Sequence, residues 1–256
     1  MGVAMALIEM PRKPLVGTLL STAIQLWLRS QVDKIDDLHF SIEGTNRSLL
    51  SGHIPQVSVS AENAIYQGLH LTQVQLQGSG IRFNLGQVLK GQPLHLLEPF
   101  WVTGDLNFNQ SDLNMSLQAP ILAQALNEFV LSLLRSMMEN PLMSSSDLKP
   151  DQDQSWINSV QQVQDTQITL ETDHLILTAK LLFSKGELLP FQLKTGLELA
   201  SSHELMFVQP QVEIQTLNTE FQLSHYTIDL GSDLKIQDLI LSAQLLQINA
   251  TVKVNP

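Results

Sequence analysis

The sequence contains no cysteine and few charged side chains for its length. The absence of cysteine excludes a disulfide scaffold, thiol catalysis and cysteine-based zinc sites. Only 15% of the 256 residues are charged, whereas about 25% is usual in a soluble domain. Lysine and arginine number 14 against 25 aspartate and glutamate residues, so the net charge of −11 repels a polyanion. We therefore expect no nucleic-acid partner.

Motifs of catalysis and of cofactor binding are also missing. The seven histidines form no HxH or HxxxH pair, and the chain has no GxSxG elbow or GxxxxGK[ST] loop. Gly78-Ser79-Gly80 begins a GxGxxG-like run, but Phe83 stands at the position of the third glycine. Asp36-Asp37 fits a solvated turn better than a general acid/base pair. We expect a protein that is not an enzyme and that uses no metal or cofactor.

No hydrophobic run is long enough to cross a bilayer as a helix. The uncharged stretch 15–28 has 14 residues, against the roughly 20 that a membrane-spanning helix needs. Arg12 and Lys13 follow the first apolar residues instead of preceding them, which does not fit a secretory signal. We expect residues 1–13 to be flexible, and the protein to be cytoplasmic or peripheral on the cytoplasmic face of a membrane.

Two segments show the apolar periodicity of an α-helix. In residues 15–28 and 121–138, pairs of apolar residues recur every four positions and form a single stripe on a helix. Pro120 stands where a helix can begin without losing a hydrogen bond, and Pro141 ends the second segment. The pattern predicts two long apolar helices.

The flanks of these helices carry two further signals. Ser111 or Asp112 is expected to cap a short helix that precedes the second long one. The first stripe ends in Trp27, and the basic residues Arg12, Lys13 and Arg29 flank it, a combination typical of helices at a membrane surface. We expect this helix to contact membranes, and the alternative is that it simply closes the sheet.

Elsewhere in the chain, apolar residues recur at every second position. Val57, Val59 and Ala61 alternate with polar residues, and the last run alternates from Leu246 to Val254. Short, closely spaced strands of this kind favour antiparallel pairing. Residues 140–155 lack any period and are expected to form a mobile linker. The sequence thus predicts a single α+β domain over residues 1–256, with an elongated, strongly curved antiparallel sheet wrapped around the long apolar helices.

Several short strings, taken together, resemble one protein family. They are Leu26-Trp27-Leu28-Arg29-Ser30-Gln31, Leu50-Ser51-Gly52-His53-Ile54-Pro55, Tyr66-Gln67-Gly68-Leu69-His70-Leu71, Gly78-Ser79-Gly80-Ile81-Arg82, Leu94-His95-Leu96-Leu97-Glu98-Pro99, Asp112-Leu113-Asn114 and Ser116-Leu117-Gln118-Ala119-Pro120. As a set they are similar to the LmeA-type phospholipid-binding family, a former domain-of-unknown-function family common in photosynthetic bacteria. The resemblance extends over nearly the whole chain and is densest over residues 15–135.

The resemblance implies a glycerophospholipid-binding protein of the cell envelope without a catalytic site. It also implies a fold similar to the tubular lipid-binding proteins, in which a twisted sheet around a long helix forms a groove for acyl chains. The function implied is non-enzymatic binding or transfer of phospholipid, with the stripes of both helices facing the lipid. The candidate lipid-binding residues on those stripes are Leu19, Leu20, Ile24, Trp27, Leu122, Leu126, Phe129 and Leu133.

Two other interpretations stay open at this point. The apolar residues are equally those of an ordinary packed core, in which case the protein is structural or an adaptor that binds partners through its outer face or its strand edges. An enzyme of envelope lipids is the weakest alternative, because no nucleophile or metal constellation is visible in the sequence. Phospholipid in an organic-solvent extract of the purified protein would favour lipid binding over both.

Overall fold

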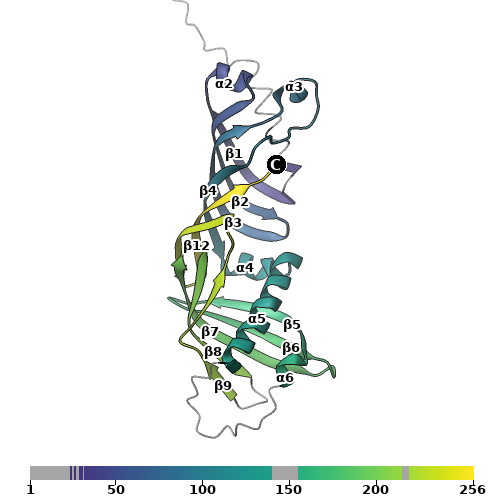
Figure 1. The fold of residues 1–256 in the computed structure, drawn as a ribbon, viewed down its shortest axis with the longest axis vertical. Coiled ribbons are helices and arrows are strands. Elements are labelled where there is room, and N and C mark those ends of the chain that lie inside the picture. The colour runs from purple at the N-terminus through teal and green to yellow at the C-terminus, as the bar shows by residue number, and fades with distance from the viewer. Residues whose placement is uncertain (1–23, 25, 27–28, 31, 140–154, 215–218) are drawn as a thin grey trace, which may run out of the picture.

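The computed structural model describes residues 24, 26, 29–30, 32–139, 155–214 and 219–256. They form an elongated molecule in which two antiparallel β-sheets follow one another along the long axis (Figure 1). The predicted α+β class and antiparallel pairing are confirmed, but the strands form two sheets instead of one. The break lies between the strands 100–109 and 160–170, which are consecutive in the chain but do not pair, and the last two strands join the sheet of the first half.

Sheet 1 contains strands from both ends of the chain. Its six strands, in spatial order, are β1 (Lys34–Glu43), β2 (His53–Tyr66), β3 (Leu69–Arg82), β4 (Phe100–Asn109), β12 (Leu245–Val254) and β11 (Leu234–Ser242). The pairing of β12 with β4 extends over ten residue pairs, from Leu245 with Asn109 to Val254 with Phe100. The C-terminal hairpin β11–β12 thereby completes a sheet that the N-terminal half began.

Sheet 2 is formed by consecutive strands of the second half. Its main path, in spatial order, is β10 (His225–Asp229), β8 (Glu204–Ile214), β7 (Leu188–Ser201), β6 (Leu175–Phe183) and β5 (Val160–Leu170), and β9 (Thr219–Gln222) also pairs with β8. Gly186 adopts φ 82° in the turn between β6 and β7, a conformation that favours glycine.

Five helices are described outside the N-terminal segment. They are α2 (Asn46–Leu50), α3 (Leu85–Val88), α4 (Gln110–Ser116), α5 (Pro120–Glu139) and α6 (Ser155–Asn158). The long helix α5 begins at Pro120 as predicted, and it lies across one face of sheet 2 (Figure 1). The predicted cap of the short helix was wrong: Asn109 caps α4, and its side-chain oxygen accepts from the Asp112 backbone N–H at 2.7 Å.

Helix α4 joins the two sheets through polar side chains. Asn114 contacts both backbone groups of Ile168 on β5: its amide nitrogen donates to the carbonyl at 2.8 Å, and its oxygen accepts from the N–H at 2.7 Å. On the opposite side, the fully buried Ser116 hydroxyl accepts from the His70 backbone N–H on β3 at 2.7 Å. Strand β5 lies at the edge of sheet 2, where no further strand is paired with it. The Asn114 side chain bonds the Ile168 backbone groups as a neighbouring strand would, so these two groups keep their hydrogen bonds. The junction between the sheets is therefore a specific hydrogen-bonded contact.

Some sequence predictions fall outside the described residues. Residues 1–13 and nearly all of the predicted linker 140–155 are among them. Of the predicted first helix, 15–28, positions 24 and 26 are described, and both are helical, as are positions 29 and 30 that follow it. Whether the sheets wrap around that helix stays a prediction.

Candidate functional site

The apolar face of sheet 1 consists of residues that stand side by side in register across the strands. Three cross-strand rows, called here the inner rows, can be followed through the paired residues. The first is Ile42–Val57–Gly78–Val102–Val252–Leu234, the second is Phe40–Val59–Leu76–Gly104–Ala250–Ile236, and the third is Ala61–Val74–Leu106–Ile248–Leu239. Facing positions of an antiparallel sheet lie on the same side, so each row is a continuous apolar band.

The inner rows are incompletely covered. Among their larger side chains only Val74 and Ile236 are buried; the others are half-buried, except Val252, which is 41% exposed. At the end of sheet 1 near α2 and α3, the face is closed by a buried cluster. Its members are Ile24, Leu49, Ile54, Ile81, Phe83, Leu94 and Phe100. Four residues of the inner rows, Phe40, Ile42, Val57 and Val102, pack against this cluster, and Ala61 and Val74 belong to a second buried cluster. The rows between the two clusters are partly buried.

Two small residues leave little side-chain volume at the centre of this face. Gly104 and Ala250 are paired in the second row, and both are buried. A Cβ added at Gly104 would lie 2.5 Å from the Leu76 side chain, closer than real Cβ atoms approach. The absence of side-chain bulk at residue 104 therefore lets Leu76 lie across the neighbouring strand.

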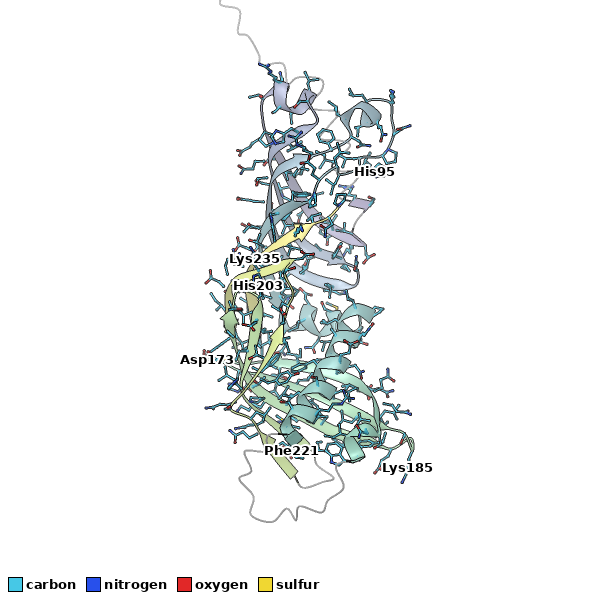
Figure 2. All side chains as sticks on the ribbon, viewed as in Figure 1. His95, Asp173, Lys185, His203, Phe221 and Lys235 are labelled. Carbon is cyan, nitrogen blue, oxygen red and sulfur yellow. The ribbon has the colours of Figure 1, made fainter. Side chains whose placement is uncertain are left out.

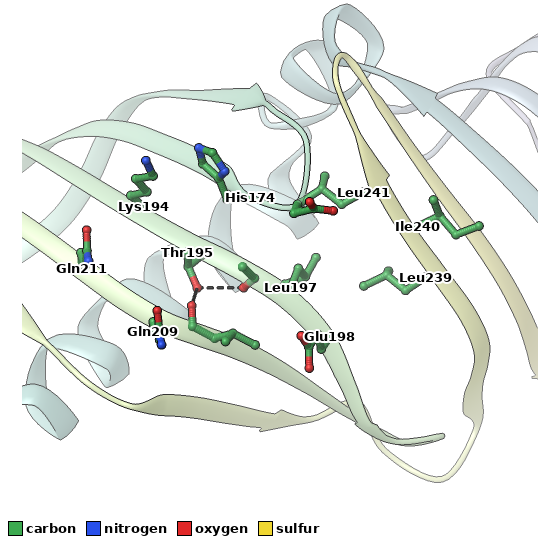
Figure 3. Close-up of a pocket in the computed structure, with 13 residues that line it drawn as sticks. His174, Lys194, Thr195, Leu197, Glu198, Gln209, Gln211, Leu239, Ile240 and Leu241 are labelled. Atoms are coloured by element: carbon green, nitrogen blue, oxygen red, sulfur yellow. Dashed lines mark hydrogen bonds between the residues drawn. The ribbon is translucent and has the colours of Figure 1, made fainter.

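A polar pocket of about 520 Å³ lies where β11 of sheet 1 approaches β7 and β8 of sheet 2 (Figure 3). Leu239 and Leu241 line it from β11, and Leu239 also belongs to the third inner row. The opposite wall carries Lys194 and Glu198. The Thr195 hydroxyl in this wall is buried and donates at 2.8 Å to the Gly196 carbonyl. One end of the apolar face thus borders a pocket with groups of both charges.

The outer face of sheet 1 is a network of amides and hydroxyls. Asn107 donates to Gln73 at 2.9 Å and accepts from Gln247 at 3.2 Å, which connects three strands. Asn249 donates to Asp105 at 2.6 Å. A second pocket of about 240 Å³ lies on this face. Many of the glutamines and asparagines therefore bind one another across the strands, as expected of a solvated sheet face.

The candidate residues on the first helix are mostly outside the described part of the chain. Leu19, Leu20 and Trp27 are in this group. Ile24 is described, is 6% exposed, and packs in the cluster that closes the end of sheet 1. One of the four first-helix candidates is thus placed next to the inner rows.

The candidate residues on α5 lie against sheet 2. Leu133 is fully buried in the core of that sheet. Phe129 is half-buried and stacks on Phe207, with ring centroids 4.4 Å apart, and Leu126 is half-buried against the same core. Leu122, near the start of the helix, is half-buried. The side chain of Leu133 is therefore fully in contact with other residues of the protein, and much of the surface of Phe129 is as well.

Sequence reasoning missed the inner rows as a unit. Their members were visible as alternating apolar residues in separate strands, but no local signal indicates that β12 pairs with β4. Within the described residues, no three His, Asp or Glu side chains come together in a way that could hold a metal ion. By length and apolar composition, no single described helix could cross a membrane; the bent pair Gln110–Ser116 and Pro120–Met137, at 89°, passes that test only when taken together.

Comparison with protein families places this chain. Residues 15–251 match the family described as LmeA-like phospholipid-binding. The match covers most of the 256 residues, and the chain belongs to this family of phospholipid-binding proteins. Neither the curated proteins nor the solved structures contain a match.

Proposed function

We propose that this protein binds phospholipid without catalysing a reaction on it, and transfers it in the handling of membrane or envelope lipids. The acyl chains lie along the inner rows of sheet 1. The observation that carries this proposal is the incomplete burial of those rows, in a molecule whose other sheet has a filled core. Membership of a phospholipid-binding family supports the chemical class of the ligand.

The energetics of such a complex need no charged or catalytic group. Transfer of one CH₂ group from water to an apolar surrounding contributes about 0.8 kcal/mol. A chain of about 16 carbons therefore gains on the order of 10 kcal/mol before the costs of association. The inner rows offer apolar contacts on six neighbouring strands, so an acyl chain can be contacted along its length. Ile24 and Leu122 are proposed to border the same site, and Leu133 is proposed to act through packing.

A direct test is to extract the purified protein with organic solvent and to identify lipids by mass spectrometry. We expect phospholipid in the extract of the wild type. The substitution Leu76→Trp places an indole ring over the half-buried second row and should lower the lipid retained per protein at least fivefold. The matched control is Gln75→Trp, which places the same ring on the exposed outer face of the same strand and should retain lipid as the wild type does.

The melting temperature of the delipidated variants separates this proposal from its rival. If the inner rows bind lipid, Leu76→Trp should leave the melting temperature within a few degrees of the control. If they are an ordinary core, the added bulk should cost about 1–3 kcal/mol of stability. Wild-type protein without lipid, together with a strongly destabilised Leu76→Trp variant, would identify a structural or adaptor protein instead.

A further inference from the structure

Two chain connections meet at one end of the elongated molecule. Residues 44–52 join β1 to β2 and contain α2, and residues 83–99 join β3 to β4 and contain α3. Figure 1 shows α2 and α3 together at this end, and His95 marks it in Figure 2. Residues 44–53 and 82–99 are called here the leucine tip.

The leucine tip exposes three large apolar side chains. Leu50 is 54% exposed, Leu89 is 55% exposed and Leu97 is 59% exposed. Their neighbours in the sequence or in space point inward, since Leu49 and Leu94 are buried in the cluster that closes the end of sheet 1. The tip therefore has a packed base with leucines projecting from it, and exposed leucines gathered at one end of a protein indicate an interaction surface.

The loop that carries two of these leucines is held in place by one side chain. The Asn84 amide nitrogen donates to the Pro93 carbonyl at 3.0 Å and to the Gln87 side chain at 2.6 Å. The Asn84 oxygen accepts from the His95 backbone N–H at 2.8 Å. Asn84 thus connects both ends of the loop, so Leu89 and Leu97 are presented by a fixed scaffold.

The charge of the leucine tip is opposite to that of the rest of the chain. Its residues include the basic Arg47, Arg82 and Lys90 against the acidic Glu98, and the exposed acidic Glu43 directly precedes it at the end of β1, in a chain of net charge −11. The Arg82 Nε and Glu98 Oε2 atoms lie 3.4 Å apart, and the charges of this ion pair cancel. Arg47 and Lys90 are therefore the basic side chains of the tip whose charge this pair does not cancel. Both side chains are exposed. An anionic surface is therefore attracted to this end and repelled by the remainder of the molecule.

We infer that the leucine tip docks on the surface of an anionic phospholipid bilayer. Leucines that enter the boundary between headgroups and acyl chains, with cations beside them at headgroup level, form the usual combination for reversible membrane attachment. The inference rests on the proposed function, because the lipid proposed to lie on the inner rows would be exchanged with this membrane, at the end of sheet 1 that the buried cluster closes. Lipid exchange then takes place while the long axis of the protein points away from the bilayer.

The apolar part of the inference is tested by flotation with liposomes. The full-length wild-type protein should bind vesicles of 70% phosphatidylcholine and 30% phosphatidylglycerol. Leu89→Asp and Leu97→Asp should each lower binding about tenfold, since each removes an inserting side chain. Leu188→Asp is the matched control, because Leu188 is 46% exposed and follows Lys185 at the opposite end (Figure 2). Equal binding by a tip variant and by this control would overturn the inference.

The electrostatic part has its own prediction. Arg47→Gln and Lys90→Gln should each lower binding about fivefold at low salt, and the difference should vanish at high salt. Lys185→Gln removes the same charge from the far end and should change binding less than twofold. This part would be contradicted if a tip charge variant bound vesicles as strongly as Lys185→Gln does. It would also be contradicted if wild-type binding did not change with the phosphatidylglycerol content of the vesicles.

The docking inference and the proposed function can fail separately. Wild-type protein that floats through its tip but contains no extractable phospholipid would support docking and refute lipid carriage. Protein that contains phospholipid but does not bind vesicles would refute docking, whatever the tip variants do. Circular dichroism on each variant confirms folding, which these exposed positions should preserve.

Discussion

Sheet 1 and sheet 2 are made from the same alternation of apolar and polar residues, but their apolar faces are covered to different extents. On sheet 2, Leu181, Leu193 and Ile214 are fully buried, and α5 adds Val130 and Leu133 to the same core. On sheet 1, Phe40, Leu106 and Ile248 stay half-buried. Within the described residues, the long helix α5 packs on sheet 2, and the half-buried face of sheet 1 is the surface proposed above for the acyl chains.

This comparison also assigns different tasks to the two halves. A filled core under a twenty-residue helix supplies stability. A sheet with half-buried apolar rows loses some of that stabilisation, because its apolar surface remains partly in water. The first half of the chain is joined to the second by α4, which bonds β5 through Asn114, and by the C-terminal strand β12, which pairs with β4.

The largest expected effect comes from truncating the filled core. Leu181→Ala on β6, where the side chain is fully buried, should lower the free energy of unfolding by about 2–5 kcal/mol. Leu106→Ala in the half-buried third row should cost only about 1 kcal/mol in delipidated protein, because less surface leaves the apolar environment. Urea denaturation of both variants measures the difference. Equal losses would show that sheet 1 is packed as fully as sheet 2.

A smaller loss is expected at the junction of the sheets. Asn114→Ala removes both partners of the Ile168 backbone groups, and leaving such groups unpaired costs about 1–3 kcal/mol. Hydrogen exchange at the Ile168 amide should accelerate at the same time. Asn46→Ala is the control, since Asn46 is exposed on α2. If the two variants unfold alike and Ile168 exchange is unchanged, α4 does not hold the sheets together.

Much of the local structure could be predicted from the sequence. Strand β12 was visible as the alternation from Leu246 to Val254, and α5 from its four-residue rhythm between Pro120 and Pro141. These signals are local, since they depend on which side of an element is apolar. The cap of α4 was misplaced, because Asn109, Ser111 and Asp112 all have capping side chains and only the backbone geometry selects Asn109.

The candidate site could be predicted far less well. The period of two places Leu106 and Ile248 on apolar faces, but it does not state that they are paired, because their strands are separated by most of the second half of the chain. Nor does the stripe of α5 distinguish Leu133, which is buried in a core, from Leu122, which is only half-buried. Both facts depend on tertiary packing, which the periodicity of a single element does not encode.

The smallest expected effect concerns the glycine at the centre of the inner rows. In Gly104→Ala the new Cβ would meet the end of the Leu76 side chain, which can move because Leu76 is half-buried. The reduced entropy of the unfolded chain offsets part of this crowding, so we expect a stability change within about 1 kcal/mol. The displaced Leu76 should nevertheless lower the phospholipid retained per protein.

A double-mutant cycle with Leu76→Ala isolates that contact. In the Gly104→Ala/Leu76→Ala variant the crowding atoms are gone, so the added methyl group should be tolerated better than in the single variant. We expect a coupling of at least about 0.5 kcal/mol between the two positions, and a partial recovery of bound phospholipid. Chemical denaturation of the four delipidated proteins measures the first quantity, and mass spectrometry of extracts measures the second. If the two substitutions add without coupling, the close approach of Leu76 is not the reason that residue 104 has no side chain, and the depth of the apolar face at this row has another cause.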